Sequence, residues 1–200
     1  MKRVCVAAAV AGFAPAALAQ PYFSDFELDD GGLLATGDWE WGNPVGANGT
    51  DLGGFGGDEP TGGFSGENVW GTVLGGLHNP STTSTLTLGG IDFSLAETLS
   101  FWEWIDSGGN SFDQARVYVN IGGIRTEVYF SDGGPSTWRQ ITADLTGFDG
   151  NGSIEWEFTT TGVVERVGWY LDDVSVTLIP APGALALVAF GGCLGLRRRR

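Results

Sequence analysis

The feature that most limits the fold of this 200-residue chain is a series of short β-type segments separated by glycine-rich turns. Within 117–121, for example, apolar and polar side chains alternate, which is the period of a strand buried on one face. Gly122-Gly123 follows at once and suits a tight hairpin turn. No window shows a persuasive helical stripe. This pattern predicts one all-β domain, built as a sandwich or a barrel.

The segments with this pattern recur at short intervals, with turn residues between them. The predicted strands are Phe23–Leu28, Asp38–Trp41, Asn68–Val73, Thr85–Leu88, Thr98–Trp104, Ala115–Ile121, Ile124–Phe130, Trp138–Leu145, Ser153–Thr159 and Gly168–Leu178. The stretch from Gly42 to Gly66 lacks the pattern and is predicted to be a long loop. Such a loop is either functional or mobile, unless an ion or a sheet edge orders it locally.

The charges are distributed unevenly along the chain. All 24 acidic residues lie between Asp25 and Asp173, whereas six of the 10 basic residues occupy the first three or the last four positions. Residues 21–178 therefore carry 24 acids against four arginines, a formal charge of −20, and no lysine. Such an acidic surface argues against a nucleic-acid partner, because phosphate binding requires basic side chains.

The N-terminus has the three parts of a secretory signal peptide. The basic start Met1–Arg3 precedes an apolar run, Val4–Leu18, and Ala17-Leu18-Ala19 has the small residues of a cleavage site. Residues 1–19 are therefore predicted to be removed by signal peptidase during export, which leaves 20–178 as the folded domain. The alternative, a buried N-terminal helix, does not account for the regular order of these parts.

The C-terminus has the layout of a short membrane anchor. Pro180 and Pro182 precede a mainly apolar run, 184–196, which as a helix would reach about 20 Å, short of the roughly 30 Å hydrocarbon core of a bilayer. The chain closes with the cluster Arg197, Arg198, Arg199 and Arg200. Arginines kept on the cytoplasmic side would leave the domain outside. The alternative is a frayed tail that ends in solvated arginines.

This tail resembles the PEP-CTERM sorting signal of bacterial proteins, in which a proline motif precedes a membrane segment and an arginine cluster. The resemblance covers 179–200. It implies an exosortase-type enzyme as partner, cleavage near the proline motif, and delivery to the cell surface or extracellular matrix. Before cleavage the tail would hold the protein in the cytoplasmic membrane. Ala181 stands where the family name specifies glutamate, which leaves the identity of the processing enzyme open.

A second resemblance covers 22–178. It is carried by Phe26-Glu27, Gly37–Gly42 (GDWEWG), Gly66–Thr72 (GENVWGT), Leu99–Trp104 (LSFWEW) and Gly168–Val176 (GWYLDDVSV). This series resembles the MAM-like jelly-roll domains appended to secreted bacterial proteins, including those that follow immune-inhibitor-A-type metallopeptidases. The resemblance implies a two-sheet antiparallel jelly-roll sandwich with an accessory or adhesive role.

Acidic residues near the two ends of the domain are candidate calcium ligands. Calcium takes about six to eight oxygen ligands, and carboxylates from distant strands can supply them. In jelly rolls of related kind, an acid of the first strand and one of the last share a structural calcium. That resemblance implies Glu27, next to Asp25, together with Asp172 or Asp173, and Asp113 is a weaker addition. The alternative is that backbone amides or an arginine satisfy these carboxylates.

The last predicted strand gives one reason to single out Asp172. Strict alternation places Tyr170, Asp172, Val174 and Val176 on one face and Asp173 on the other. If the first face is the core, Asp172 is a carboxylate at its margin. A buried carboxylate requires a cation or several hydrogen-bond donors.

Two Trp-x-Trp pairs raise the question of a sugar-binding surface. Trp39 with Trp41, and Trp102 with Trp104, each present both rings on one face of a strand. The favoured interpretation is that these rings belong to the core, because a sandwich strand buries one face. If the rings are exposed instead, Trp41 and Trp104 are the candidates to stack on an extracellular polysaccharide.

Few of the residues that hydrolytic enzymes use occur between 20 and 178. His78 is the only histidine and precedes Asn79-Pro80 in a predicted loop, so neither a two-histidine metal centre nor a Ser-His-Asp triad is supported. Both cysteines, Cys5 and Cys193, lie in the predicted processing segments.

Paired carboxylates could still cleave a glycan if two of them faced one cleft. The nominal pairs are Glu155 with Glu157 and Glu103 with Asp106. Alternation with apolar residues favours a solvated sheet face for the first pair.

Together these patterns predict an exported, non-catalytic jelly-roll domain at the cell surface or in the matrix, with a structural or adhesive role and calcium as a candidate stabilising ion. A carbohydrate-binding module is the alternative, and a glycan-cleaving enzyme is the third.

Overall fold

The computed structural model describes residues 21–48, 57–109, 111–131, 133–134 and 136–179, and these ranges contain eleven strands and no helix. The strands are β1 (Tyr22–Ser24), β2 (Leu34–Ala35), β3 (Trp39–Gly42), β4 (Val69–Thr72), β5 (Thr83–Asp92), β6 (Ala96–Asp106), β7 (Gln114–Ile121), β8 (Ile124–Ser131), β9 (Arg139–Asp144), β10 (Asn151–Thr159) and β11 (Gly168–Leu178). The all-β prediction is confirmed. The predicted signal peptide and the sorting residues Pro180, Pro182 and Arg197–Arg200 lie outside the described ranges. Within those ranges no helix is long and apolar enough to cross a membrane.

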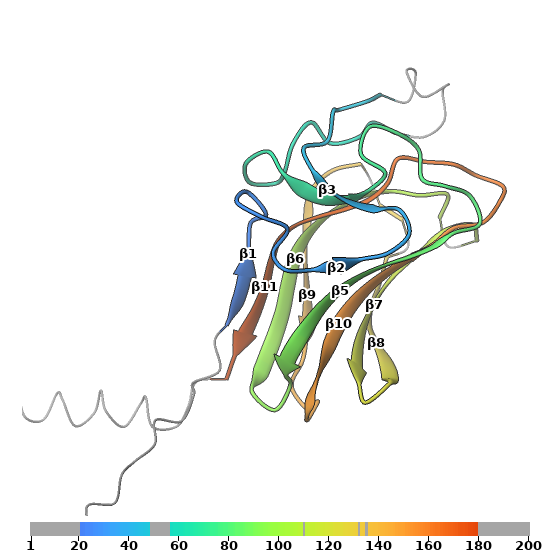
Figure 1. Cartoon of the computed structure of the whole chain (residues 1–200). Coiled ribbons are helices and arrows are strands. Elements are labelled where there is room, and N and C mark those ends of the chain that lie inside the picture. The colour runs from blue at the N-terminus through green and yellow to red at the C-terminus, as the bar shows by residue number, and fades with distance from the viewer. Residues whose placement is uncertain (1–20, 49–56, 110, 132, 135, 180–200) are drawn as a thin grey trace, which may run out of the picture.

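Two antiparallel sheets pack face to face (Figure 1). Sheet A has the order β3-β4-β11-β6-β9, and β1 pairs with the C-terminal half of β11. Sheet B has the order β2-β5-β10-β7-β8. The predicted two-sheet antiparallel sandwich is therefore confirmed, and it brings the first and last strands of the domain side by side.

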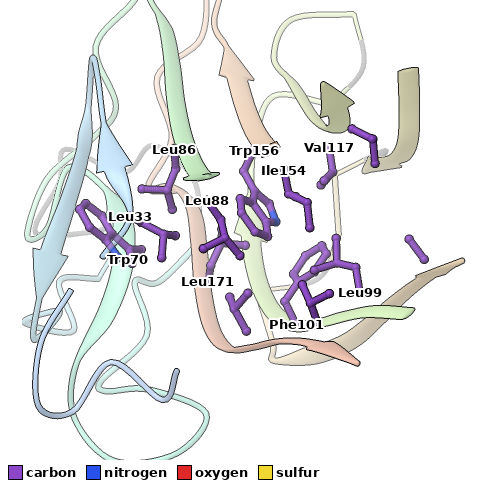
Figure 2. Close-up of a cluster of buried hydrophobic side chains, with 14 of the residues drawn as sticks. Leu33, Trp70, Leu86, Leu88, Leu99, Phe101, Val117, Ile154, Trp156 and Leu171 are labelled. Carbon is purple, nitrogen blue, oxygen red and sulfur yellow. The ribbon is translucent and has the colours of Figure 1, made fainter. Parts of the chain in front are cut away.

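The core lies between the two sheets and is built by strict alternation. In sheet B, every second residue is buried in β5 up to Leu88 and in β10 from Ile154, and the same holds along most of β6 in sheet A. Figure 2 shows Leu88, Ile154 and Trp156 of sheet B directed toward Phe101 and Leu171 of sheet A. Burying a large apolar side chain contributes about 1.5–3 kcal/mol, so this interface is the main source of stability.

The polypeptide enters and leaves the sandwich at the same end. Tyr22 in β1 lies opposite Val176 in β11, and the amide of Ile179 donates a hydrogen bond to the carbonyl oxygen of Leu95, 2.8 Å away. Residues 107–109, 111–113 and 160–167, which belong to two connections, lie at the opposite end, which we call the distal end (Figure 1).

Two sequence predictions about the first strands were wrong. The strand predicted at Phe23–Leu28 ends at Ser24, because Phe26 adopts a positive φ of 58° and turns the chain away from the sheet. The two-residue strand β2 was missed, since both of its residues are exposed and no alternation can show in so short a segment. The hairpin predicted at Gly122-Gly123 is confirmed, with φ of 61° and 87° at these two positions.

The strict alternation predicted along the last strand was also wrong. β11 contains a bulge between Asp172 and Ser175, where Asp173 adopts a positive φ of 47°. Before the bulge, Tyr170 packs in a small cluster outside the main core, whereas Val174 and Val176 after it belong to that core. Asp172 therefore does not share a face with Val174. It lies on the outer face of sheet A, the face turned away from sheet B.

Candidate functional site

Residues 57–67, the second of the two described parts of the long loop, cover the outer face of sheet A. The amide of Gly57 donates to Oδ2 of Asp106 at 2.6 Å, and Nε1 of Trp104 donates to the carbonyl oxygen of Asp58 at 3.2 Å. Loop residues thus pair with side chains of β6. Residues 57–67 are therefore ordered by sheet A, although through its outer face on the inner strand β6 and not through the sheet edge that the sequence suggested.

Glu59 fixes this loop from beneath. Its side chain is only 1% exposed and accepts hydrogen bonds from the amide of Ala47 at 3.1 Å and from the amide of Gly75 at 2.6 Å. The hydroxyl of Tyr170 lies 3.1 Å from Oε1 of the same carboxylate. Burial, with the charge of Glu59 beside it, raises the pKa of Tyr170 far above its usual value, so this phenol stays a donor.

Phe64 continues the cover with an aromatic contact. Its ring stacks on the indole of Trp102 in β6, with centroids 3.4 Å apart and planes 8° from parallel. Phe64 itself remains 43% exposed. The indole face that a sugar ring would use is therefore already occupied by a side chain of the protein.

Asp172 is fully buried under the next residues of the loop. Its Oδ2 accepts a hydrogen bond from the amide of Ser65 at 2.9 Å, and its Oδ1 accepts one from the amide of Asp173 at 2.7 Å. The hydroxyl of Ser65 donates to Oδ1 of Asp173 at 2.8 Å. Burial raises the pKa of Asp172 to about 7, because no arginine within the described ranges pairs with it to offset the lost hydration.

Glu27 meets the other end of the same loop. Its Oε1 accepts hydrogen bonds from the amides of Glu67 at 2.9 Å and Asn68 at 2.8 Å. Asp25, which the sequence placed beside it, accepts a hydrogen bond from the amide of Glu27 at 3.3 Å. The segment 63–68 therefore joins Glu27 to Asp172 and Asp173, and we call Glu27, Asp172 and residues 63–68 the loop site.

The loop site contains a cluster of oxygen atoms around Gly63. A Cβ on Gly63 would lie 2.6 Å from Oδ2 of Asp172 and 3.3 Å from the carbonyl oxygen of Asn68, and closer still to the carbonyl oxygen of Ser65. One carboxylate and two carbonyl oxygens are ligands that suit calcium. Within the described ranges no three acidic, histidine or cysteine side chains gather as a metal site, so main-chain carbonyls would have to complete the set.

Asp113 has a different environment from the other predicted ligands. Its Oδ2 lies 3.4 Å from Nε2 of His78, and both side chains are completely buried near the distal end. The amides of Gly108 and Thr161 also donate to it. Burial works to raise the pKa of Asp113, but His78 and these amides together hold it below its usual value. Asp113 thus has a histidine and two main-chain amides as its partners.

The four tryptophans of the Trp-x-Trp pairs do not share one environment. Trp39 belongs to the main core, as favoured from the sequence. Trp41 is 40% exposed and its Nε1 donates to the carbonyl oxygen of Phe26 at 3.0 Å. Trp102 and Trp104 lie outside the main core, beneath Phe64 and against Trp138 respectively. The core interpretation therefore holds for Trp39 and was wrong for Trp41 and Trp102, whereas Trp104 packs against the smaller buried cluster outside the main core.

The nominal carboxylate pairs do not form a cleft. Glu103 is buried between the sheets, where it binds Nε of Arg139 at 2.7 Å, whereas Asp106 is on the outer face beneath the loop. Glu155 and Glu157 lie on the outer face of sheet B, and both bind Arg125 at 2.8 Å.

No protein-family profile and no curated protein matches the sequence. Solved structures do resemble the fold. The K1 cleaved adhesin domain of Lys-gingipain from Porphyromonas gingivalis has a TM-score of 0.54 and 17% identity, over 80% of this chain and 98% of that one. The CBM22-1 xylan-binding domain of Xyn10C from Paenibacillus barcinonensis has a TM-score of 0.50 and 12% identity, over 80% and 94%. At this identity the likeness shows a shared β-sandwich fold.

Proposed function

We propose that this chain is an exported, non-catalytic β-sandwich protein of the cell surface or matrix, with a structural or adhesive role and a calcium ion at the loop site. The observation that carries the proposal is the convergence of Glu27 and Asp172, from the two ends of the domain, on the segment 63–68. A fold that resembles an adhesin domain supports the adhesive role. A non-catalytic role is supported by the positions of the nominal carboxylate pairs, which do not face a common cleft.

The chemistry of the loop site favours a bound cation over a buried carboxylate that only hydrogen bonds stabilise. The buried carboxylate of Asp172 faces carbonyl oxygens, and none of the four arginines of 21–178 pairs with it within the described ranges. A divalent ion would restore the favourable interactions that burial removes. It would also clamp the first strand region to the last, and so hold the loop on sheet A.

Thermal unfolding in calcium and in EGTA tests the ion. Calcium at 100 times its dissociation constant should stabilise the fold by about 2.7 kcal/mol, or raise Tm by about 5–10 °C. Asp172→Asn should lower Tm in calcium, yet leave it equal or higher in EGTA, because the amide removes a buried carboxylate that no arginine of the described ranges pairs with. Glu97→Gln, an exposed acid on β6, is the matched control and should behave like the native protein. If the Tm of the native protein does not change at any calcium concentration, the proposed calcium ion is wrong.

Surface delivery is tested in the host by fractionation and mass spectrometry. Signal peptidase cleavage after Ala19 gives a mature chain that begins at Gln20, and exosortase-type processing gives a C-terminus near Pro182. Replacing Arg197–Arg200 with alanine should release the precursor from the cytoplasmic membrane or leave it unprocessed. A mature protein that stays inside the cell with both ends intact would overturn the proposed localisation.

A carbohydrate-binding module is the second candidate function. It is favoured by the partial exposure of the Trp41 ring and by the likeness to a xylan-binding domain. A glycan array with the native protein and Trp41→Ala tests it, with Trp104→Ala as a control because that indole is tied beneath the loop. Binding that Trp41→Ala abolishes in a folded protein would favour the module, and an array without signal would remove it.

A further inference from the structure

A cavity at the distal end is separate from the loop site. It has a volume of about 400 Å³ and is lined by Gly162, Val163, Val164, Glu165 and Arg166, in the connection between β10 and β11. This volume lies within the range of about 300–1,000 Å³ that small-molecule sites occupy. Val163 is 76% exposed, so an apolar side chain faces solvent at this position.

The segment that lines the cavity is held firmly at both ends. At one end, the carbonyl oxygen of Thr161 accepts the amide of Ser81 at 3.1 Å. At the other end, the amide of Arg166 donates to Nε2 of His78 at 3.1 Å, and the carbonyl oxygen of Arg166 accepts the amide of His78 at 2.9 Å. Asp113, 3.4 Å from Nε2 of His78, binds the amide of Thr161. The buried His78–Asp113 pair therefore fixes both ends of the cavity segment.

The middle of this segment leaves its own polar groups unused. Within the described ranges, the only hydrogen bond to the main chain of 162–165 is the one from Arg166 Nη1 to the carbonyl oxygen of Glu165, at 3.4 Å. Firmly held, unpaired amide and carbonyl groups beside aliphatic side chains can bind the hydroxyl groups and the C–H face of a sugar. A peptide would instead be expected at a free sheet edge.

Arg166 is the only basic side chain of the cavity lining, where the exposed carboxylate of Glu165 is the only acid. Arg116 pairs with Glu127, Arg125 with Glu155 and Glu157, and Arg139 with Glu103. Arg166 makes no ion pair with any carboxylate of the described residues. In a segment with a formal charge of −20, its guanidinium is thus left to bind an external carboxylate, and arginine does this with two parallel hydrogen bonds.

We propose that the distal cavity binds a uronic acid residue of an extracellular saccharide, with its carboxylate on Arg166 and its hydroxyl groups on the main chain of 162–165. The proposal rests on the adhesive function proposed above and gives that function a ligand class. The charge of −20 repels a densely charged polyanion, so the ligand carries an isolated uronic acid, as at a chain end.

Titration calorimetry on the purified full chain tests the site with two matched probes, methyl β-D-glucuronide and the uncharged methyl β-D-glucoside. The glucuronide should bind and the glucoside should bind at least about tenfold more weakly, because the charged hydrogen bonds are lost. Arg166→Gln should remove this difference. Arg125→Gln, which alters an arginine of the sheet B face, should leave glucuronide binding unchanged.

Equal binding of the two probes, no binding of either, or full glucuronide binding by Arg166→Gln would overturn the proposal. Arg166→Gln should remain folded, since its side chain makes only a 3.4 Å contact with a neighbouring carbonyl oxygen, and its Tm checks this. Because the titration uses purified protein, its failure would leave the proposed export and the calcium site standing.

Discussion

The ring of Phe64 covers the indole of Trp102 at 3.4 Å, so a loop side chain occupies the aromatic face that β6 turns away from the core. The pair explains how an outward-facing tryptophan in a Trp-x-Trp motif is shielded from solvent without entering the main core. It also ties the loop to the sheet beside Asp172, which lies opposite Trp102 on β11. The loop residues thus pack on the outer face of sheet A and form a second, smaller layer of packing outside the main core.

Phe64→Ala should loosen this layer. Loss of a stacked aromatic contact costs about 0.5–1.5 kcal/mol beyond the buried area, so Tm should fall by several degrees. Acrylamide should quench a larger fraction of the tryptophan fluorescence, because Trp102 becomes accessible. Phe23→Ala removes a ring of the same size that is 65% exposed on β1, and it should change neither measurement. Unchanged quenching in Phe64→Ala would mean that the stack does not persist in solution.

The sequence predicted the sandwich well because its strands follow an alternating pattern that local residues carry. A resemblance at both ends of the domain also singled out Glu27 and an acid of the last strand as candidate calcium ligands. It failed at the Asp173 bulge, since a positive φ at an aspartate leaves no trace in an alternation of residue types. The core prediction for Trp102 and Trp104 was wrong for a related reason. The residues that contact these rings on the outer face come from a glycine-rich loop, whose low hydrophobicity gives no sign of packing.

Glu59, Phe64 and Ser65 were missed as residues of the site. They lie in or next to a glycine-rich stretch, where neither the strand period nor a known motif applies. The one available signal was an aromatic and a glutamate within an otherwise small and polar loop. Such residues are costly to leave exposed or to bury alone, so they indicate that the loop packs on something.

Asp113→Asn should lose the pH dependence that its carboxylate contributes. The folded pKa lies below the ordinary value near 3.8, so Asp113 adds stability that is present above that pH and disappears as the pH falls through the folded pKa. At pH 7 the variant should be less stable by about 1.5–3 kcal/mol, the worth of hydrogen bonds to a charged group. Urea unfolding from pH 7 to pH 2.5 should show this gap closing below about pH 4. A gap that stays constant would contradict the lowered pKa.

Glu103→Ala should be among the most destabilising single changes in the domain. The carboxylate is buried between the sheets and accepts hydrogen bonds from Nε of Arg139 at 2.7 Å and Nε1 of Trp169 at 2.8 Å. The loss should be about 2–4 kcal/mol, because the buried indole N–H of Trp169 is left without its acceptor, whereas the guanidinium of Arg139 is partly exposed to water. Glu97→Ala, on the exposed face of the same strand, should change the free energy of unfolding by less than about 0.5 kcal/mol. Urea unfolding of both variants measures the difference, and equal values would mean that the Glu103 network is not formed.

Gly66→Ala and Gly32→Ala separate backbone strain from the geometry of the loop site. Both glycines have a positive φ, 65° and 71°, so each alanine should cost about 1–2 kcal/mol from this cause alone. A Cβ on Gly66 would also overlap the carboxylate of Glu27, within 2.6 Å of its Oε2, whereas a Cβ on Gly32 would meet no atom within 4 Å. Gly66→Ala should therefore lose more stability than Gly32→Ala, and it alone should lose the rise in Tm with calcium, because Glu27 is pushed from its place beside Asn68. If both variants keep the same calcium response, Glu27 does not act with Asp172 at the loop site.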